Sequence, residues 1–119
     1  MERRRVVVTG LGAINAIGHN VEETWKSIKE GVCGIDEITN YDKELTKVKI
    51  AGEVKNFNAA DYLDKKAVRK MDRFTQFGVI AAKEAFKDAG LKIEEIDADR
   101  FGVVVSSGIG GLATCLLYT

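Results

Sequence analysis

The chain of 119 residues contains no proline, one histidine and two cysteines, and its 18 basic and 18 acidic side chains give a formal net charge of zero. A neutral chain lacks the overall field that would hold it on nucleic acid or on an anionic membrane. Two cysteines are too few for a disulfide framework or a metal cluster, and one histidine excludes any site that needs two. We therefore expect no nucleic-acid partner, no membrane partner, no metal site and no cofactor.

Long hydrophobic runs are also absent: no stretch reaches the length of about 18 apolar residues that a membrane span requires. The basic start of the chain is followed by only three valines before Thr9, which is too short for the apolar region of a signal peptide. With 45% hydrophobic and 30% charged residues, the composition is typical of a soluble globular protein rather than a disordered one. The sequence therefore predicts a cytoplasmic protein.

Two runs of β-branched residues predict strands. Residues 4–9 (RRVVVT) and residues 101–106 (FGVVVS) each contain three consecutive valines. Continuous apolar runs of this kind are typical of strands that are buried on both faces, as in a parallel sheet.

Two helices are predicted between these strands. The first begins after Asn20, whose side chain suits an N-cap, and Glu23 three residues later completes a capping box. The second covers residues 72–89, which carry an apolar stripe at helical spacing and are followed by Gly90. The remaining expected elements are a half-exposed strand over residues 47–54, in an excursion from the main sheet, and a short helical segment over residues 61–70.

The order strand, helix, excursion, helix, strand predicts an α/β fold with parallel pairing. Only two core strands are visible, whereas a parallel sheet normally has more strands and is covered on both faces. We therefore expect that the chain stops before its fold is complete. Unpaired sheet edges and an uncovered helix face predict poor stability for such a piece.

A first glycine loop, residues 10–15, follows a predicted strand and precedes a helix. Dinucleotide-binding folds have such a loop, in which glycines let backbone N–H groups approach a pyrophosphate. Here Asn15 stands at the position of the third glycine, and no acidic residue ends a second strand about 20 residues later. A nucleotide-binding βα module stays open as an alternative, although a tight turn after a buried strand is favoured.

A second glycine loop, residues 106–111 (SSGIGG), places Ile109 between glycines. It fits either a turn that packs closely on a helix or a pocket wall where backbone must approach a ligand, and the residues alone do not decide. Cys33 has no basic neighbour that would lower its pKa, and Cys115 sits in an apolar tail, so both are expected to be inert thiols.

Basic residues outnumber acidic ones between residues 64 and 73. A charge run is usually a solvated face, but it also suits docking of an acidic partner. The basic side chains are Lys65, Lys66, Arg69, Lys70 and Arg73.

Three stretches together resemble the N-terminal part of bacterial 3-oxoacyl-[acyl-carrier-protein] synthases, above all the type II enzymes of fatty-acid elongation. They are residues 4–12 (RRVVVTGLG), 69–76 (RKMDRFTQ) and 107–111 (SGIGG), in the order and spacing of that family. The resemblance runs from about Arg3 to Leu112. Each stretch alone is a weak signal, and the combination is specific.

The resemblance implies a thiolase-like α/β fold, with two similar halves that each hold a mixed five-stranded sheet between helices, in a homodimer. It implies an acyltransferase that performs a decarboxylating Claisen condensation. In that reaction an acyl group is loaded onto a cysteine thiolate, malonyl-carrier protein loses carbon dioxide, and the resulting carbanion attacks the thioester.

Residue by residue, the resemblance implies that Lys66, Arg69 and Lys70 contact the acidic acyl carrier protein and that Ile109 lines the acyl pocket. The family's nucleophilic cysteine and both its histidines lie well beyond the matched stretch, so no catalytic residue carries over, and Cys115 receives no role. We therefore expect residues 1–119 to be the N-terminal portion of a β-ketoacyl synthase N-terminal domain. The tail 113–119 is expected to depart from the family. The chain alone is expected to be inactive, and a non-catalytic fragment that docks the carrier protein remains an alternative.

Overall fold

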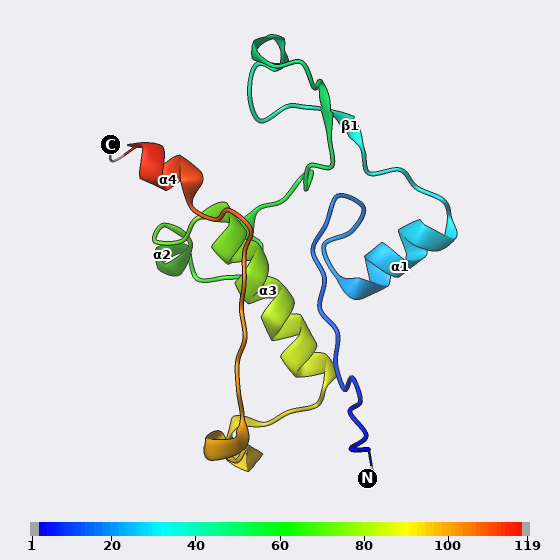
Figure 1. Cartoon of the computed structure of the whole chain (residues 1–119), viewed down its shortest axis with the longest axis vertical. Coiled ribbons are helices and arrows are strands. Elements are labelled where there is room, and N and C mark those ends of the chain that lie inside the picture. The colour runs from blue at the N-terminus through cyan, green and yellow to red at the C-terminus, as the bar shows by residue number, and fades with distance from the viewer. Residues whose placement is uncertain (1–2, 118–119) are drawn as a thin grey trace. The chain divides into compact units, whose positions relative to one another are not determined.

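The computed structural model describes residues 3–117, whose secondary structure is mostly short helices (Figure 1). The chain divides into two compact units. The inserted unit consists of residues Ala13–Asn58, and the helix unit combines the segment ending at Gly12 with the segment that begins at Ala59. Within the described residues, no helix is long and apolar enough to cross a membrane.

The inserted unit begins with helix α1, Val21–Lys29, and the predicted capping box is confirmed. The Asn20 side chain accepts a hydrogen bond from the Glu23 N–H at 2.8 Å, and the Glu23 carboxylate accepts one from the His19 N–H at 2.8 Å. The first bond satisfies an amide that the first helical turn would otherwise leave open, and the second ties the Glu23 side chain to the residue before the N-cap. The helix ends before Gly31, whose φ of +68° is accessible to glycine without strain.

Strands β1, Asp36–Glu37, and β2, Ile50–Ala51, form an antiparallel pair in the inserted unit, with Asp36 opposite Ala51 and Glu37 opposite Ile50. The 3₁₀-helix η1, Lys43–Leu45, lies between them in the chain. The strand predicted over residues 47–54 is therefore much shorter than expected. Beyond the paired residues, the Glu53 carboxylate replaces backbone carbonyls as the hydrogen-bond acceptor. It accepts from the N–H groups of Thr39 and Asn40, which follow β1.

Helix α3, Arg73–Asp88, is the longest helix of the helix unit, which confirms the prediction for residues 72–89. Gly90, with φ +64°, follows its C-cap residue Ala89. The segment predicted as helical over residues 61–70 holds only the four-residue helix α2, Lys65–Val68. The other elements of this unit are the 3₁₀-helices η2, Ala59–Asp61, η3, Ile93–Glu95, and η4, Ala98–Arg100, and the short helix α4, Leu112–Leu117.

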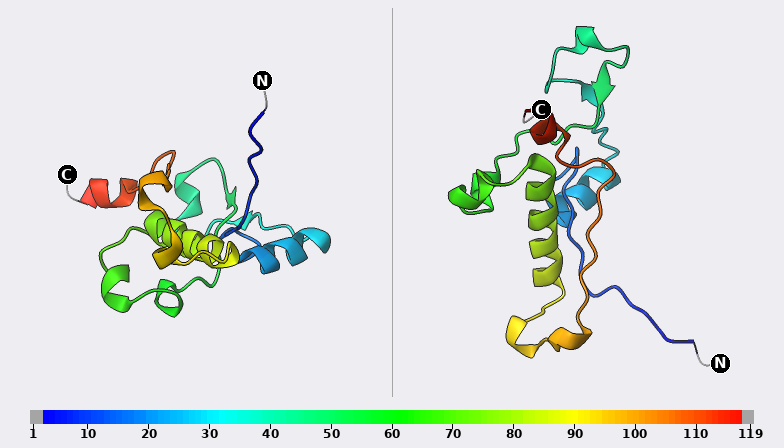
Figure 2. Two further views of the ribbon diagram at one scale, coloured as in Figure 1. Left: turned by 90° about the horizontal axis from the view of Figure 1, so that it is seen from below. Right: turned by 60° about the vertical axis from the view of Figure 1, so that its left-hand side comes forward.

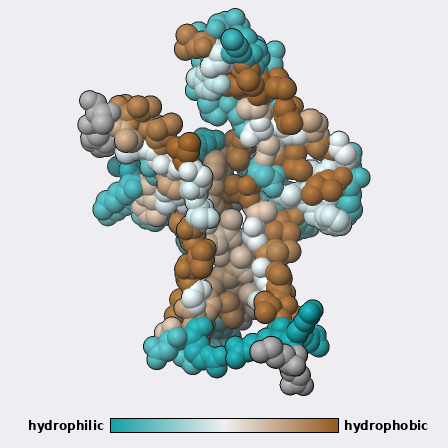
Figure 3. All heavy atoms as spheres, viewed as in Figure 1, coloured by the Kyte–Doolittle hydropathy of each residue, from teal (hydrophilic) through white to brown (hydrophobic). Residues whose placement is uncertain are grey.

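The predicted strands at residues 4–9 and 101–106 are extended, but neither forms a β-ladder with any described residue. The expectation that they are buried is wrong for this chain, since Val6 is 92% and Val104 is 96% exposed. A strand requires the backbone of a neighbour at hydrogen-bonding distance, and the described residues supply none for these segments. Hydrophobic side chains therefore line both segments on the surface (Figure 3).

Two segments nevertheless run along α3: residues 10–12, which directly follow the first extended segment, and the second extended segment (Figures 1 and 2). Gly10 packs near Ala89 and Gly12 near Ala81, so the first segment runs opposite to the helix. The second segment reaches Phe74, at the start of α3, only at Gly110, so it runs in the same direction as the first. Two parallel segments on one helix, together with the small sheet, make an incomplete α/β fold, as predicted.

Candidate functional site

The basic segment, residues 65–70, lies on α2 and the turn that follows it. Asp64 caps α2 through hydrogen bonds from the Lys66 and Ala67 N–H groups at 2.9 and 3.2 Å. Ala59 and Leu63, which precede this turn in the chain, are buried. The structure thus brings the predicted residues Lys66, Arg69 and Lys70 onto one short surface segment.

The charges of this segment are available to a partner. Lys66, Arg69 and Lys70 are all exposed. Among residues 3–117, the lysines that form ion pairs are others, namely Lys43, Lys49, Lys55 and Lys92.

Gln76 of α3 fixes the basic segment to the start of that helix. Its side-chain amide donates to the carbonyl oxygens of Val68 at 3.3 Å and Met71 at 3.0 Å, which belong to the end of α2 and the turn after it. At the first residue of α3, the guanidinium of Arg73 lies 5.3 Å from the centre of the Phe77 ring. The basic segment is therefore attached to α3 by hydrogen bonds as well as by the chain.

Ile109 lies on a glycine loop that packs against the start of α3. A Cβ atom placed on Gly110 would lie 2.6 Å from two carbon atoms of the Phe74 ring, so a larger residue there would displace the ring. Gly111 has φ +70° and faces the Asp72 carboxylate. The Ile109 side chain itself is 80% exposed. Of the two interpretations that the sequence left open, close packing on a helix is therefore present in the structure.

An apolar groove of about 440 Å³ lies between α3 and the second extended segment. Phe74 belongs both to this groove and to the packing of the glycine loop, whereas Ile109 is not part of the groove lining. The lining residues are Phe74, Thr75, Phe77, Gly78, Val79, Ala82, Val105, Ser106 and Ser107.

The glycines of the first loop have a structural explanation. Any side chain on Gly10 or Gly12 would overlap the α3 backbone, so both glycines allow close helix packing. Asn15, at the position of the missing third glycine, closes a tight turn: its N–H donates to the Gly18 carbonyl at 2.9 Å and its side-chain oxygen accepts from the Ile17 N–H at 3.0 Å. These contacts account for the loop without a nucleotide.

Cys33 and Cys115 are exposed and belong to different units. Cys115 follows the second glycine loop, and its N–H donates to the Gly111 carbonyl at 2.9 Å. The His19 ring nitrogen Nε2 lies 2.8 Å from the Lys55 carbonyl oxygen, and the ring meets Phe57 edge-on at 5.9 Å. Within residues 3–117 there is no group of three or more metal-ligating side chains.

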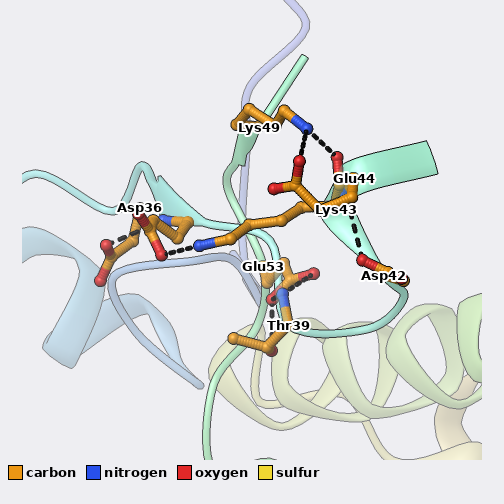
Figure 4. A network of polar contacts seen from close by, with 8 residues as sticks. Asp36, Thr39, Asp42, Lys43, Glu44, Lys49 and Glu53 are labelled. Carbon is orange, nitrogen blue, oxygen red and sulfur yellow. Dashed lines mark hydrogen bonds and ion pairs between the residues drawn. The ribbon is translucent and has the colours of Figure 1, made fainter. Parts of the chain in front are cut away.

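The inserted unit also contains a polar network that was not predicted from the sequence (Figure 4). Glu53 accepts hydrogen bonds from the Thr39 hydroxyl at 2.7 Å, from the Thr39 N–H at 3.0 Å and from the Asn40 N–H at 3.1 Å. The hydroxyl, followed by these N–H groups, holds the pKa of Glu53 below its ordinary value. No periodicity could reveal this network, because its partners are 13 and 14 residues apart.

Asp36 is the second carboxylate of the inserted unit whose pKa is lowered. The Lys55 ammonium group donates to its carboxylate at 2.6 Å, and the Glu37 N–H donates to it at 2.8 Å. The hydrogen bond from Lys55, the Glu37 N–H and the charge of Lys55 together lower the pKa of Asp36.

Comparison with known proteins finds a matching family and several similar sequences. Residues 3–119 match the family described as Beta-ketoacyl synthase, N-terminal domain. The chain is 54% identical over 113 residues to 3-oxoacyl-[acyl-carrier-protein] synthase 2 of Staphylococcus aureus strain COL, covering 95% of this chain and 27% of the relative. It is 46% identical over 112 residues to the protein of the same name from Synechocystis sp. (strain ATCC 27184 / PCC 6803 / Kazusa), covering 94% of this chain and 27% of the relative.

Two solved structures share its fold. The ishigamide ketosynthase/chain length factor matches with a TM-score of 0.70 and 37% identity, over 80% of this chain and 24% of that chain. A type II PKS acyl-carrier protein in complex with its ketosynthase bound to the hexaketide matches with a TM-score of 0.60 and 29% identity, over 81% of this chain and 25% of that chain. The chain thus spans about a quarter of the length of its curated relatives.

Proposed function

Because the chain belongs to the β-ketoacyl synthase family through its N-terminal domain, we propose that it is the N-terminal portion of a 3-oxoacyl-[acyl-carrier-protein] synthase. Such an enzyme elongates fatty acyl chains by decarboxylating condensation with malonyl-carrier protein and acts in the cytoplasm as a homodimer. The names of the curated relatives and the three motifs at residues 4–12, 69–76 and 107–111 support this proposal.

Within this proposal, the basic segment docks an acyl carrier protein. The observation that carries the assignment is the exposure of Lys66, Arg69 and Lys70 on one capped turn, without an ion-pair partner among the described residues. Exposed charges of one sign raise the rate of association with an oppositely charged partner and orient it. A structural neighbour of this chain is a ketosynthase bound to an acyl-carrier protein, which also supports the assignment.

Ile109 contributes to the acyl pocket in this proposal. Its side chain stands out from a loop of small residues, which leaves the surrounding backbone accessible to a ligand. The thiolate that receives the acyl group and the two histidines that serve decarboxylation are not assigned to any residue of this chain. We therefore propose that the chain alone binds carrier protein and does not perform the condensation.

Charge reversal in the basic segment tests the docking assignment. Arg69→Glu replaces attraction by repulsion, so we expect its Kd for acyl carrier protein to rise about tenfold, equivalent to about 1.4 kcal/mol. The effect is expected to be larger at low salt than at high salt, because the charges are exposed and screened by ions. Fluorescence anisotropy with labelled carrier protein measures the binding.

Lys83→Glu is the matched control, since it makes the same change of net charge on the exposed surface of α3, away from the basic segment. We expect it to change the Kd much less than Arg69→Glu does. Equal Kd values for the wild-type chain and Arg69→Glu at low salt would refute the docking role.

A further inference from the structure

Asp72 stands at the N-cap position of α3, but its carboxylate makes no capping hydrogen bond. An aspartate at this position ordinarily accepts from the second or third amide of the helix. Here the carboxylate instead accepts a hydrogen bond from the hydroxyl of Thr114, 42 residues further along the chain. Helix α3 therefore has no side-chain capping bond at its start, and the Asp72 carboxylate contacts a residue distant in the sequence instead.

The contact with Thr114 is one of two that hold the glycine loop to the start of α3. The Phe74 ring packs on Gly110 so closely that a Cβ atom there would lie 2.6 Å from the ring. A Cβ atom on Gly111 would lie 2.9 Å from the Asp72 carboxylate. Ile109 is the residue directly before this pair of glycines, so its position depends on the two contacts.

The same helix start is attached to the basic segment. Gln76 donates to the carbonyl oxygens of Val68 and Met71, and only Lys70 and Met71 separate Arg69 from Asp72. The first turns of α3 therefore contact both the basic segment and the glycine loop that carries Ile109.

We propose that Asp72 and Phe74 are positioning residues that link the carrier-docking segment to Ile109, so that carrier binding changes the environment of Ile109. This inference rests on the proposed function, because it assigns docking to the basic segment and the acyl pocket to Ile109. Neither Asp72 nor Phe74 needs to touch a ligand in this account. They act through the loop that they hold.

The test uses the whole chain with ¹³C-labelled isoleucine δ1 methyl groups, observed by NMR. Ile109 reports on the loop, and Ile80, which is buried in α3, reports on the fold of the helix. In the free protein, Asp72→Ala and Gly110→Ala are expected to shift the Ile109 resonance and leave that of Ile80 in place. Thr114→Val removes the same hydrogen bond without altering α3 and is expected to shift Ile109 as Asp72→Ala does.

Two matched variants separate positioning from general damage. Asp72→Asn keeps a side-chain oxygen that accepts from Thr114 and is expected to restore the wild-type Ile109 resonance. Gly108→Ala adds the same methyl group on the other side of Ile109, where a Cβ atom meets nothing within 4 Å. It is expected to perturb Ile109 less than Gly110→Ala does.

Titration with apo acyl carrier protein then tests the link. The wild-type chain is expected to show a saturable shift of Ile109, whereas Asp72→Ala still binds the carrier and loses that shift. The proposal is overturned if Asp72→Ala and Thr114→Val leave Ile109 unmoved in the free protein, or if Ile109 of Asp72→Ala responds to the carrier as the wild type does. Absence of any binding would overturn both the proposed docking function and the link, while the free-protein shifts would still show whether Asp72 and Phe74 position the loop.

Discussion

Gly10 and Gly12 show at the scale of single residues how a glycine motif can serve packing. The space that a side chain would need at each is filled by the backbone of α3. The Leu11 N–H between them donates to the Asp88 carboxylate at 2.9 Å, which fixes the segment on the end of the helix. Glycine is required at these two positions because a neighbouring backbone approaches them closely.

Alanine at Gly12 is expected to destabilise the helix unit by about 1–3 kcal/mol, because the added methyl group overpacks the contact with Ala81. Gly78→Ala is the matched control, since a Cβ atom there meets nothing within 4 Å. Alanine inside a helix is expected to stabilise by about 0.5–1 kcal/mol relative to glycine. Urea unfolding followed by far-UV circular dichroism measures both, and a Gly12→Ala chain as stable as the wild type would contradict the packing account.

Glu53 predicts a pH dependence in the inserted unit. Its pKa is lowered in the folded chain, so the stability that it contributes is present above its ordinary pKa of 4.5 and is lost as the pH falls through the folded value. We expect the amide resonances of Thr39 and Asn40 to titrate with a midpoint below 4.5 in ¹H–¹⁵N NMR spectra.

Glu53→Gln is the control for this titration, because it keeps an oxygen acceptor but carries no titrating charge. Asp36 also has a lowered pKa, so it titrates in the same acidic range as Glu53. The Glu53→Gln variant distinguishes the two, because any titration that remains in it comes from another group. A midpoint above 4.5, or an unchanged titration of both amides in Glu53→Gln, would contradict the assignment.

Residue patterns that act locally could be predicted from the sequence. The capping box of Asn20 and Glu23 involves neighbours three residues apart, and the structure confirms it. The contacts of Glu53 with Thr39 and of Asp72 with Thr114 could not be predicted, because they depend on how distant segments meet. The roles of Lys66, Arg69, Lys70 and Ile109 came from the family resemblance and remain predictions.

At the scale of elements, the two main helices α1 and α3 formed as predicted, and the two buried strands did not. Helix α3 satisfies its own backbone hydrogen bonds, so its apolar stripe and the following glycine were sufficient to predict it. The runs of valine at residues 4–9 and 101–106 identify segments suited to a sheet, but a strand forms only with a partner. The described residues contain no partner, and the valines are left exposed.

The exposed segments are expected to drive self-association. Val104 is almost fully exposed on an unpaired extended segment, and such edges pair readily with other chains. Val104→Lys places a charge on this edge and is expected to reduce the associated fraction in sedimentation velocity experiments. Leu45→Lys makes the same change of charge at an exposed apolar residue in a 3₁₀-helix, so it is expected to have less effect. If the two variants associate equally, the edge is not the cause.

At the scale of the whole molecule, the described residues bury few side chains. Ile38, Ala59, Leu63 and Ile80 are the buried apolar residues of the described chain, while many larger apolar side chains are exposed. A core of this size offsets little conformational entropy, which supports the expectation of poor stability. The valine-rich segments at residues 4–9 and 101–106 have no partner strand among the described residues, so the apolar surfaces that a sheet would cover stay open.

We propose that this chain holds docking and pocket residues, namely Lys66, Arg69, Lys70 and Ile109, and that the catalytic groups of the enzyme lie elsewhere. Cys33 and Cys115 are exposed thiols in different units, and neither is given a role in acyl transfer. This division between binding and chemistry is the central claim.

The most direct test incubates the purified chain with acyl-carrier protein and malonyl-carrier protein, and follows binding by anisotropy and covalent products by mass spectrometry. We predict saturable binding that Arg69→Glu weakens, with no acyl adduct on the chain and no elongated product. An acyl group on Cys115 followed by carbon–carbon bond formation would contradict the claim that the catalytic groups lie outside this chain.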